Sequence, residues 1–262
     1  MPEDSDFQAF YLREIGVHTP LMAQSEQSAV DGVVKEKLVL SPTDVLSQKK
    51  SEDDLQKTHQ GTLQKSVQVS TTAGTKAASM SAPLQELAMQ AATCRGCQLA
   101  AERNNVVFGT GNPEADIVFI GEAPGRDEDL KGEPFVGRSG KLLDRMLVSL
   151  GMDRSQVYIM NTVKCRPPNN RDPKPEEVEA CGKWFDAQLK TVAPKLICLL
   201  GRVAAQTVLE TDAPLATMRE KWHEYHGIPV LVMYHPAYLL RSPQQKSQAW
   251  RDLCTLRQRY HS

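Results

Sequence analysis

The chain has 262 residues, of which 24% are charged and 40% hydrophobic, and this composition is typical of a soluble protein with room for one sizeable domain. No apolar run approaches the roughly 18 residues of a membrane span, and the acidic N-terminus lacks the apolar core of a signal peptide. A net charge of −1 excludes a protein that binds nucleic acid through overall basicity. We therefore expect a monomeric cytoplasmic protein without a membrane partner.

The first 82 residues differ in composition from the rest of the chain. Residues 41–82 are rich in Ser, Thr, Gln and Lys, and such a segment buries too little apolar surface to offset the entropy of ordering. We expect residues 1–82 to form a mostly disordered N-terminal extension, followed by a folded domain over residues 83–262. Within the extension, residues 7–15 carry apolar side chains at helical spacing. They indicate either a short helix that docks on a partner protein or a frayed terminus.

From residue 83 onward, helical and strand patterns alternate. The segment 83–94 predicts a helix, and it precedes four apolar runs that predict strands, at residues 117–120, 157–163, 196–200 and 230–234. Helical patterns lie between or after these runs, at residues 140–150, 176–192, 203–209 and 245–260. This alternation predicts a parallel sheet covered on both faces. With right-handed crossovers, the fold class is α/β, a three-layer α/β/α sandwich with a four-stranded, mostly parallel central sheet.

Polar and glycine residues follow each predicted strand. Residues 121–129 (GEAPGRDED) place four carboxylates in one Gly/Pro-rich turn after the first strand, and the end of the second carries Asn161, Lys164 and Cys165. Gly201 and His235 follow the third and fourth strands. Open α/β sheets bind their ligands at the carboxyl ends of the strands. We therefore expect these residues to converge on one crevice, although a lone histidine is also a common structural residue.

Four of the six cysteines form a candidate metal site. Cys94 and Cys97 make a C-x-x-C pair at a helix end, Cys165 lies in a loop, and Cys181 lies in the following helix. Four thiolates suit either zinc or an iron–sulfur cluster, and the lack of a second C-x-x-C pair favours iron–sulfur. Unrelated core thiols are the alternative. The remaining two, at positions 198 and 254, lie in apolar runs and are expected to be ordinary buried thiols.

Three features indicate contact with a polyanion. Residues 237–241 are apolar where a solvent-facing loop is expected, and exposed apolar side chains beside a basic segment can wedge into a base stack. The last 22 residues carry five Lys and Arg against one acid, which fits either phosphate contact or a solvated terminal helix. Ser139 opens a predicted helix, where it is either part of a phosphate site or a plain N-cap.

Several short motifs occur in order between Leu84 and Tyr260. They are Cys94-x-x-Cys97, residues 121–129 (GEAPGRDED), residues 132–137 (GEPFVG), residues 161–168 (NTVKCRPP), Cys181 and residues 235–240 (HPAYLL). Together they resemble the family 4 uracil-DNA glycosylases, the iron–sulfur bacterial and archaeal branch of that superfamily. The resemblance covers about two-thirds of the chain.

The resemblance implies an enzyme that acts on uracil-containing DNA. Such an enzyme hydrolyses the N-glycosidic bond of uracil, releases the free base and leaves an abasic site, which initiates base excision repair. Two alternatives remain open. The same fold could act mainly on another deaminated base such as hypoxanthine or xanthine, or the chain could be a non-catalytic module that binds damaged DNA or assists replication.

The resemblance also implies roles for particular residues. Four thiolates would ligate a [4Fe–4S] cluster that organises structure and DNA contact rather than redox catalysis, namely those of Cys94, Cys97, Cys165 and Cys181. Phe135 would stack on the flipped uracil, and Asn161 would hydrogen-bond its Watson–Crick edge. The backbone at Glu122 and Ala123 would help to hold the base and to position the water.

The remaining roles concern the leaving group and the DNA. His235 would stabilise the departing uracil anion at a carbonyl oxygen, a type of contact whose loss typically costs about 10²–10³ in rate. Leu239 or Leu240 would fill the gap left in the duplex, beside Arg241. A carboxylate, either that of Glu122 or that of Glu128, would orient the water and offset the positive charge on the sugar.

Overall fold

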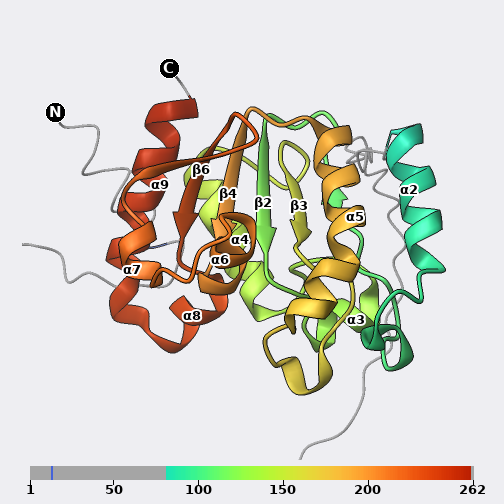
Figure 1. The fold of residues 1–262 in the computed structure, drawn as a ribbon. Coiled ribbons are helices and arrows are strands. Elements are labelled where there is room, and N and C mark those ends of the chain that lie inside the picture. The colour runs from blue at the N-terminus through green and yellow to red at the C-terminus, as the bar shows by residue number, and fades with distance from the viewer. Residues whose placement is uncertain (1–12, 14–80, 261–262) are drawn as a thin grey trace, which may run out of the picture. The chain divides into compact units, whose positions relative to one another are not determined.

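The computed structural model describes residue 13 and residues 81–260 (Figure 1). The expected N-terminal extension over residues 1–82 and its docking segment at residues 7–15 therefore lie almost entirely outside the described residues. Within the described part of the chain, no helix is both long and apolar enough to span a bilayer.

The sheet has six strands, in the order β1-β3-β2-β4-β6-β5. They are β1 (Thr110–Gly111), β2 (Ile117–Gly121), β3 (Tyr158–Asn161), β4 (Leu196–Leu200), β5 (Trp222–Tyr225) and β6 (Ile228–Met233). The four central strands are parallel to one another, whereas β1 and β5 pair antiparallel at the two edges. The four strands predicted from sequence are thus the central four, and the expected strand number was wrong because both edge strands were missed.

The missed edge strands lack the signal that marks the central ones. Strand β1 has only two residues, too few for any pattern, and β5 (WHEY) is only partly buried. By contrast, every residue of β2, β3 and β4 is buried, which produces the continuous apolar runs typical of parallel strands with both faces covered.

Helices cover both faces of the sheet, which confirms the three-layer α/β/α sandwich (Figure 1). One face packs against α4 (Arg138–Ser149), α8 (Pro236–Arg241) and α9 (Lys246–Tyr260). The other packs against four helices: α2 (Ala82–Ala92), α5 (Pro175–Val192), α6 (Arg202–Val208) and α7 (Leu215–Met218). The remaining short helices are α3 (Arg126–Lys131), η1 (Gln98–Ala101), η2 (Pro168–Asn170) and η3 (Pro243–Gln245).

Two segments expected to be loops are helical. The second half of the acidic motif forms α3, which begins at Arg126 after Gly125. The segment after His235 forms α8 rather than an exposed apolar loop. The physical reason lies in Pro236: proline is pre-organised for the first helical position, and the Nδ1 atom of His235 caps the helix by accepting a hydrogen bond from the Ala237 N–H.

The correction to α8 changes the position of Leu239. Its side chain is fully buried and packs in the core between α8 and the sheet. Leu240 is partly buried against the same core, and Arg241 is exposed. A wedge into DNA requires an exposed side chain, so the structure leaves Leu240 rather than Leu239 in a position to reach DNA.

Candidate active site

A cavity of about 780 Å³ lies at the carboxyl ends of β2, β3, β4 and β6. Glu122, Asn161, Gly201 and His235 line it, so these residues after the predicted strands converge as expected. The expectation was wrong for Lys164 and Cys165, which line a second, smaller cavity instead. Phe135 also lines the larger cavity. Four other residues singled out from the sequence also line the cavity: Ala123, Glu128, Ser139 and Arg241.

The carboxamide of Asn161 carries a buried, unsatisfied acceptor in this wall. Its side chain is 2% exposed, and among the described residues its Oδ1 atom has no hydrogen-bond partner. Gly121, which is opposite Asn161 in the parallel ladder, makes room for it, because a Cβ there would lie 2.4 Å from Oδ1. A buried unsatisfied acceptor costs about 1–3 kcal/mol. Such a group in a cavity wall is suited to accept a hydrogen bond from a ligand.

Phe135 holds its ring over the same glycine. A Cβ on Gly121 would lie 2.7 Å from the ring atom Cζ of Phe135. The ring also stacks on His235, with 5.5 Å between the ring centroids and 30° between the planes. The backbone of Phe135 has a φ of 54°, in the left-handed region that non-glycine residues avoid. Such a conformation costs on the order of 1–3 kcal/mol and persists only where surrounding contacts impose it.

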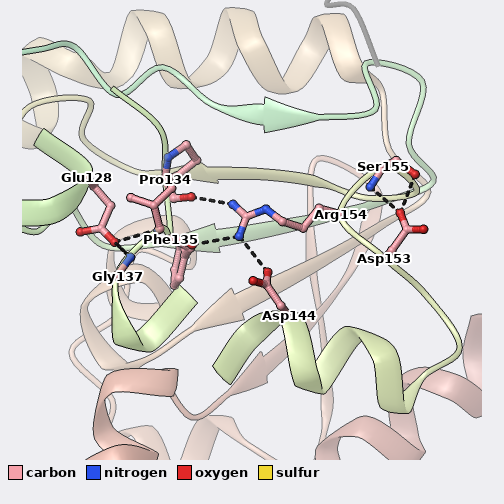
Figure 2. A network of polar contacts seen from close by, with 9 residues as sticks. Glu128, Pro134, Phe135, Gly137, Asp144, Asp153, Arg154 and Ser155 are labelled. Atoms are coloured by element: carbon pink, nitrogen blue, oxygen red, sulfur yellow. Dashed lines mark hydrogen bonds and ion pairs between the residues drawn. The ribbon is translucent and has the colours of Figure 1, made fainter. Parts of the chain in front are cut away.

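Glu128 ties the acidic motif to the Phe135 loop. Its carboxylate is 7% exposed and accepts three backbone N–H hydrogen bonds, from Gly125 at 3.1 Å and from Val136 and Gly137 at 3.0 Å each. Figure 2 shows Glu128 facing the N–H of Gly137. Because both carboxylate oxygens are engaged by backbone donors, Glu128 is built to hold two loops together.

Glu122 has the opposite environment. It is half-buried in the cavity wall, and no hydrogen bond to its carboxylate exists among residues 81–260. Burial, followed by repulsion from the Asp172 carboxylate, raises the pKa of Glu122 to about 7, and the Arg202 guanidinium opposes the shift. Asp172 and Arg202 form an ion pair at 2.7 Å in the same wall. Glu122 is therefore the carboxylate free to interact with water or with a developing positive charge.

His235 presents a neutral imidazole. The Ala237 N–H donates to Nδ1 at 3.0 Å, so the neutral ring carries its proton on Nε2. Burial, with a smaller contribution from Arg241, lowers the pKa of His235 to about 4. Gly201 allows β4 to end close to this ring, since it has a φ of 95° and a Cβ there would lie 2.9 Å from the His235 Cβ. Near neutral pH His235 is therefore a hydrogen-bond donor without charge.

The four candidate ligand cysteines surround a second, smaller cavity between α2, α5 and the end of β3. Cys94, Cys97, Cys165 and Cys181 all line it. Three of the four sulfurs accept hydrogen bonds: Cys94 from Trp184 at 3.3 Å and Gly96 at 3.4 Å, Cys165 from Arg103 at 3.1 Å, and Cys181 from the Lys164 backbone at 3.3 Å. Donors aimed at sulfur stabilise thiolates.

The four cysteines offer an all-sulfur donor set around one cavity. Among residues 81–260, no group of three or more His, Cys, Asp or Glu side chains is arranged to hold a metal ion. By its chemistry, the all-sulfur donor set suits either zinc or an iron–sulfur cluster. Cys198, by contrast, is fully buried in β4 and belongs to the hydrophobic core, as expected. The expectation was wrong for Cys254, which lies in α9 and is only partly buried against the same core.

Sequence analysis missed several residues of the cavity wall. Arg202 directly follows Gly201 at a strand end, so the rule that located His235 could have found it. Asp172 also lines the cavity but follows no predicted strand, and it reaches the site only through the path of its loop, for which the sequence offers no pattern. Tyr238 lies in α8, within the segment after the fourth predicted strand, and also lines the cavity.

Comparisons with known proteins place the chain in a family. The family model described as "Uracil DNA glycosylase superfamily" matches residues 108–254. The type-4 uracil-DNA glycosylase of Archaeoglobus fulgidus is 47% identical over 175 residues, which cover 63% of this chain and 87% of the relative. The type-4 enzymes of Sulfurisphaera tokodaii and Thermotoga maritima are 40% and 44% identical, over 67% and 57% of this chain and over 84% and 79% of their own lengths.

Proposed function

We propose that this chain, a type-4 member of the uracil DNA glycosylase superfamily, carries out its reaction in the cavity lined by Glu122, Asn161 and His235. The reaction is the removal of uracil from DNA by hydrolysis of its N-glycosidic bond. The observation that carries the assignment is the buried Oδ1 atom of Asn161, which has no partner among the described residues and lines the cavity wall. A base inside a duplex is unreachable, so uracil enters by flipping out of the stack.

Asn161 reads the edge of the flipped base. Uracil presents a donor at N3 and an acceptor at O4, and a carboxamide offers the matching acceptor and donor. Cytosine presents the opposite pattern and would leave buried groups unpaired, which costs more than the two lost bonds alone. The Phe135 ring, already stacked on His235, supplies the flat surface on which the base lies.

Cleavage of the glycosidic bond places positive charge on the sugar and negative charge on uracil. The Nε2–H of His235 donates to a uracil carbonyl oxygen as the anion forms, which is electrostatic stabilisation from a fixed neutral donor. Glu122 orients the attacking water and offsets the sugar cation. Glu128, whose oxygens are held by backbone N–H groups, contributes by fixing the loops on which Glu122 and Phe135 lie.

The pKa of Glu122 predicts a pH dependence. Because the carboxylate is the active form and its pKa is raised to about 7, kcat/KM should fall about tenfold per pH unit below pH 7 and level off above it. Glu122→Gln should abolish this inflection and lower the plateau about 10²-fold. The measurement is uracil release between pH 5 and 9. Glu114→Gln, an exposed change outside the cavity, is the control and should keep the wild-type profile; an unaltered profile in Glu122→Gln would refute the assignment.

Ser139, Leu240 and Arg241 are proposed to contact the DNA around the flipped base. Ser139 lies in the first turn of α4, where backbone N–H groups suit a phosphate oxygen. Leu240 is the apolar side chain of α8 available for the gap in the stack, and the exposed Arg241 attracts the adjacent backbone.

A [4Fe–4S] cluster is proposed as the cofactor, held by Cys94, Cys97, Cys165 and Cys181. When bound, it would supply four strong bonds that fix the loop between α2 and η1, the loop after β3 and the start of α5 relative to one another, without redox work in the reaction. The hydrogen bonds from Trp184, Arg103 and the Lys164 backbone to the ligand sulfurs would stabilise the thiolates.

The cofactor proposal predicts a colour change on mutation. Protein purified without air should be brown and contain about four iron atoms per chain, and Cys165→Ala should lose both the absorption band and the iron. Cys198→Ala removes a thiol that is buried in β4 instead, so its iron content should match that of the wild type. Stoichiometric zinc in the purified protein would overturn the proposal.

The function itself is tested with a panel of oligonucleotides, each carrying one uracil, hypoxanthine, xanthine or thymine. The expected result is abasic-site formation over many turnovers on uracil, with the other bases released far more slowly. Preferential release of hypoxanthine or xanthine would favour the alternative substrate. Binding to damaged DNA without any abasic product would favour the non-catalytic module.

A further inference from the structure

Arg154 hydrogen-bonds to the backbone of the loop that carries Phe135. It lies in the turn between α4 and β3, outside the cavity lining. Its guanidinium donates to two consecutive carbonyl oxygens, that of Pro134 at 2.7 Å and that of Phe135 at 2.9 Å, and pairs with Asp144 at 2.8 Å. Figure 2 shows the side chain of Arg154 directed at these three oxygens.

The loop is held from its other side as well. Glu128 accepts the N–H groups of Val136 and Gly137, so the two carbonyls before and at Phe135 and the two N–H groups after it are all engaged. Helix α4 closes the third side at Gly140, where a Cβ would lie 1.7 Å from the Phe135 carbonyl oxygen. Only a glycine in α4 lets that carbonyl turn toward Arg154.

These contacts fix a backbone conformation that Phe135 would not adopt alone. Its φ of 54° is unfavourable for a residue with a side chain. The planar fork of arginine binds two acceptors at once in a fixed geometry, which lysine cannot reproduce. Because the Cα–Cβ direction follows from the backbone angles, holding the two carbonyls determines where the ring points.

We propose that Arg154 is a positioning residue that holds the Phe135 ring in place for the flipped uracil. The inference rests on the proposed role of Phe135 in stacking on the base. Without Arg154, the peptide units at Pro134 and Phe135 relax, and the ring leaves its position between Gly121 and His235. A misplacement of about 1 Å in a reactive arrangement can cost 10²-fold in rate.

The test is Arg154→Met in the full-length holoenzyme. We expect kcat/KM for a uracil oligonucleotide to fall about 10- to 100-fold, with binding of undamaged DNA changed no more than in a charge control. That control is Arg145→Met, which removes the same charge from an exposed position of α4. It should retain wild-type excision, and it accounts for weakened attraction to DNA.

A double-mutant cycle with Phe135→Ala separates positioning from general structural support. If Arg154 acts through the ring, Arg154→Met should change kcat/KM within about twofold in the Phe135→Ala background. An equal loss in both backgrounds would overturn the inference, as would wild-type excision by folded Arg154→Met. Should Arg154→Met fail to fold in a thermal melt, Arg154→Lys takes its place in the same cycle. It retains the charge but not the fork, and its expected kcat/KM lies between those of Arg154→Met and the wild type.

The same experiment distinguishes failure of the inference from failure of the function. If the wild type releases no uracil, the function fails. If the wild type is active and Phe135→Ala excises uracil at the wild-type rate, the stacking role fails and the inference with it. If Phe135→Ala is impaired but Arg154→Met is not, only the inference fails.

Discussion

Asn161→Ala is expected to lower kcat/KM for uracil excision by about 10²–10³-fold, or more, without loss of stability. Sites that hydrogen-bond a substrate discriminate against an unmatched one by up to about 10⁴–10⁵, and this variant removes both partners of the uracil edge. Stability should hold because Oδ1 is buried and has no partner among the described residues in the free enzyme, so truncation removes an unsatisfied group. The measurements are steady-state excision and a thermal melt.

Asn112→Ala provides the matched control. Asn112 lies in the turn between β1 and β2, and its Oδ1 atom accepts the Glu114 N–H at 2.9 Å. This variant loses a satisfied hydrogen bond, so it should lose some stability, on the order of 1 kcal/mol, and retain excision. The opposite pattern, with a destabilised but active Asn161→Ala, would show that Asn161 has a structural role only.

His235→Ala is expected to lower kcat by about 10²–10³-fold, because it removes a donor aimed at the leaving group. It also removes the cap of α8, which costs about 1 kcal/mol. His235→Asn separates the two effects. Asparagine is a good N-cap residue, but its shorter side chain does not place a donor where Nε2 lies, so this variant should recover stability and remain inactive.

The charge state of His235 adds a second readout. With its pKa lowered to about 4, the ring is neutral above that pH, so excision by Glu122→Gln, which lacks the Glu122 inflection, should stay constant between pH 5 and 9. Activity that rises as the pH falls from 7 to 5 would mean that the imidazolium is the active form. Recovery of excision by His235→Asn would mean that the capping role accounts for the loss in His235→Ala.

The assignment of the carboxylates shows what the structure adds to the motif. In the sequence, Glu122 and Glu128 occur in one acidic turn and are equivalent candidates. In the fold, Glu128 lies in the first turn of α3 and its carboxylate accepts three backbone N–H groups, whereas burial and repulsion from Asp172 raise the pKa of Glu122. Asp129 is also structural, since it accepts hydrogen bonds from Asn104 and Asn105. Which of the two glutamates is free to act on water depends on their hydrogen-bond partners. The spacing of residues in the sequence does not reveal these partners.

The hydrophobic pattern of the sequence predicts much of the fold and of the site. The elements that it does not predict have physical reasons for escaping it. The central strands β2, β3, β4 and β6 are continuous apolar runs, and the parallel topology brings their ends together, so the convergence of Asn161 and His235 is predictable. The edge strands carry no such run. The apolar run of residues 237–240 predicts an exposed loop, whereas His235 and Pro236 form a capped start of helix α8 and Leu239 is buried.

The role of Arg154 cannot be predicted from the sequence, for a different reason. It lies in a turn with neighbours that carry no motif, and its importance depends on two backbone carbonyls 19 and 20 residues away in sequence. The unusual backbone angle of Phe135 is likewise absent from the sequence, because a non-glycine residue gives no sign of a positive φ. Contacts between side chains and distant backbone become visible only in the folded chain.

The assignment of Asn161 to a uracil pocket is tested most directly by mass detection of the base released from an oligonucleotide with one uracil, for the wild type and Asn161→Ala in parallel. We expect the wild type to release free uracil over many turnovers and to leave an abasic site, and Asn161→Ala to release uracil at least about a hundredfold more slowly. Release of uracil by Asn161→Ala at the wild-type rate, or no base released by the wild type, would contradict the assignment.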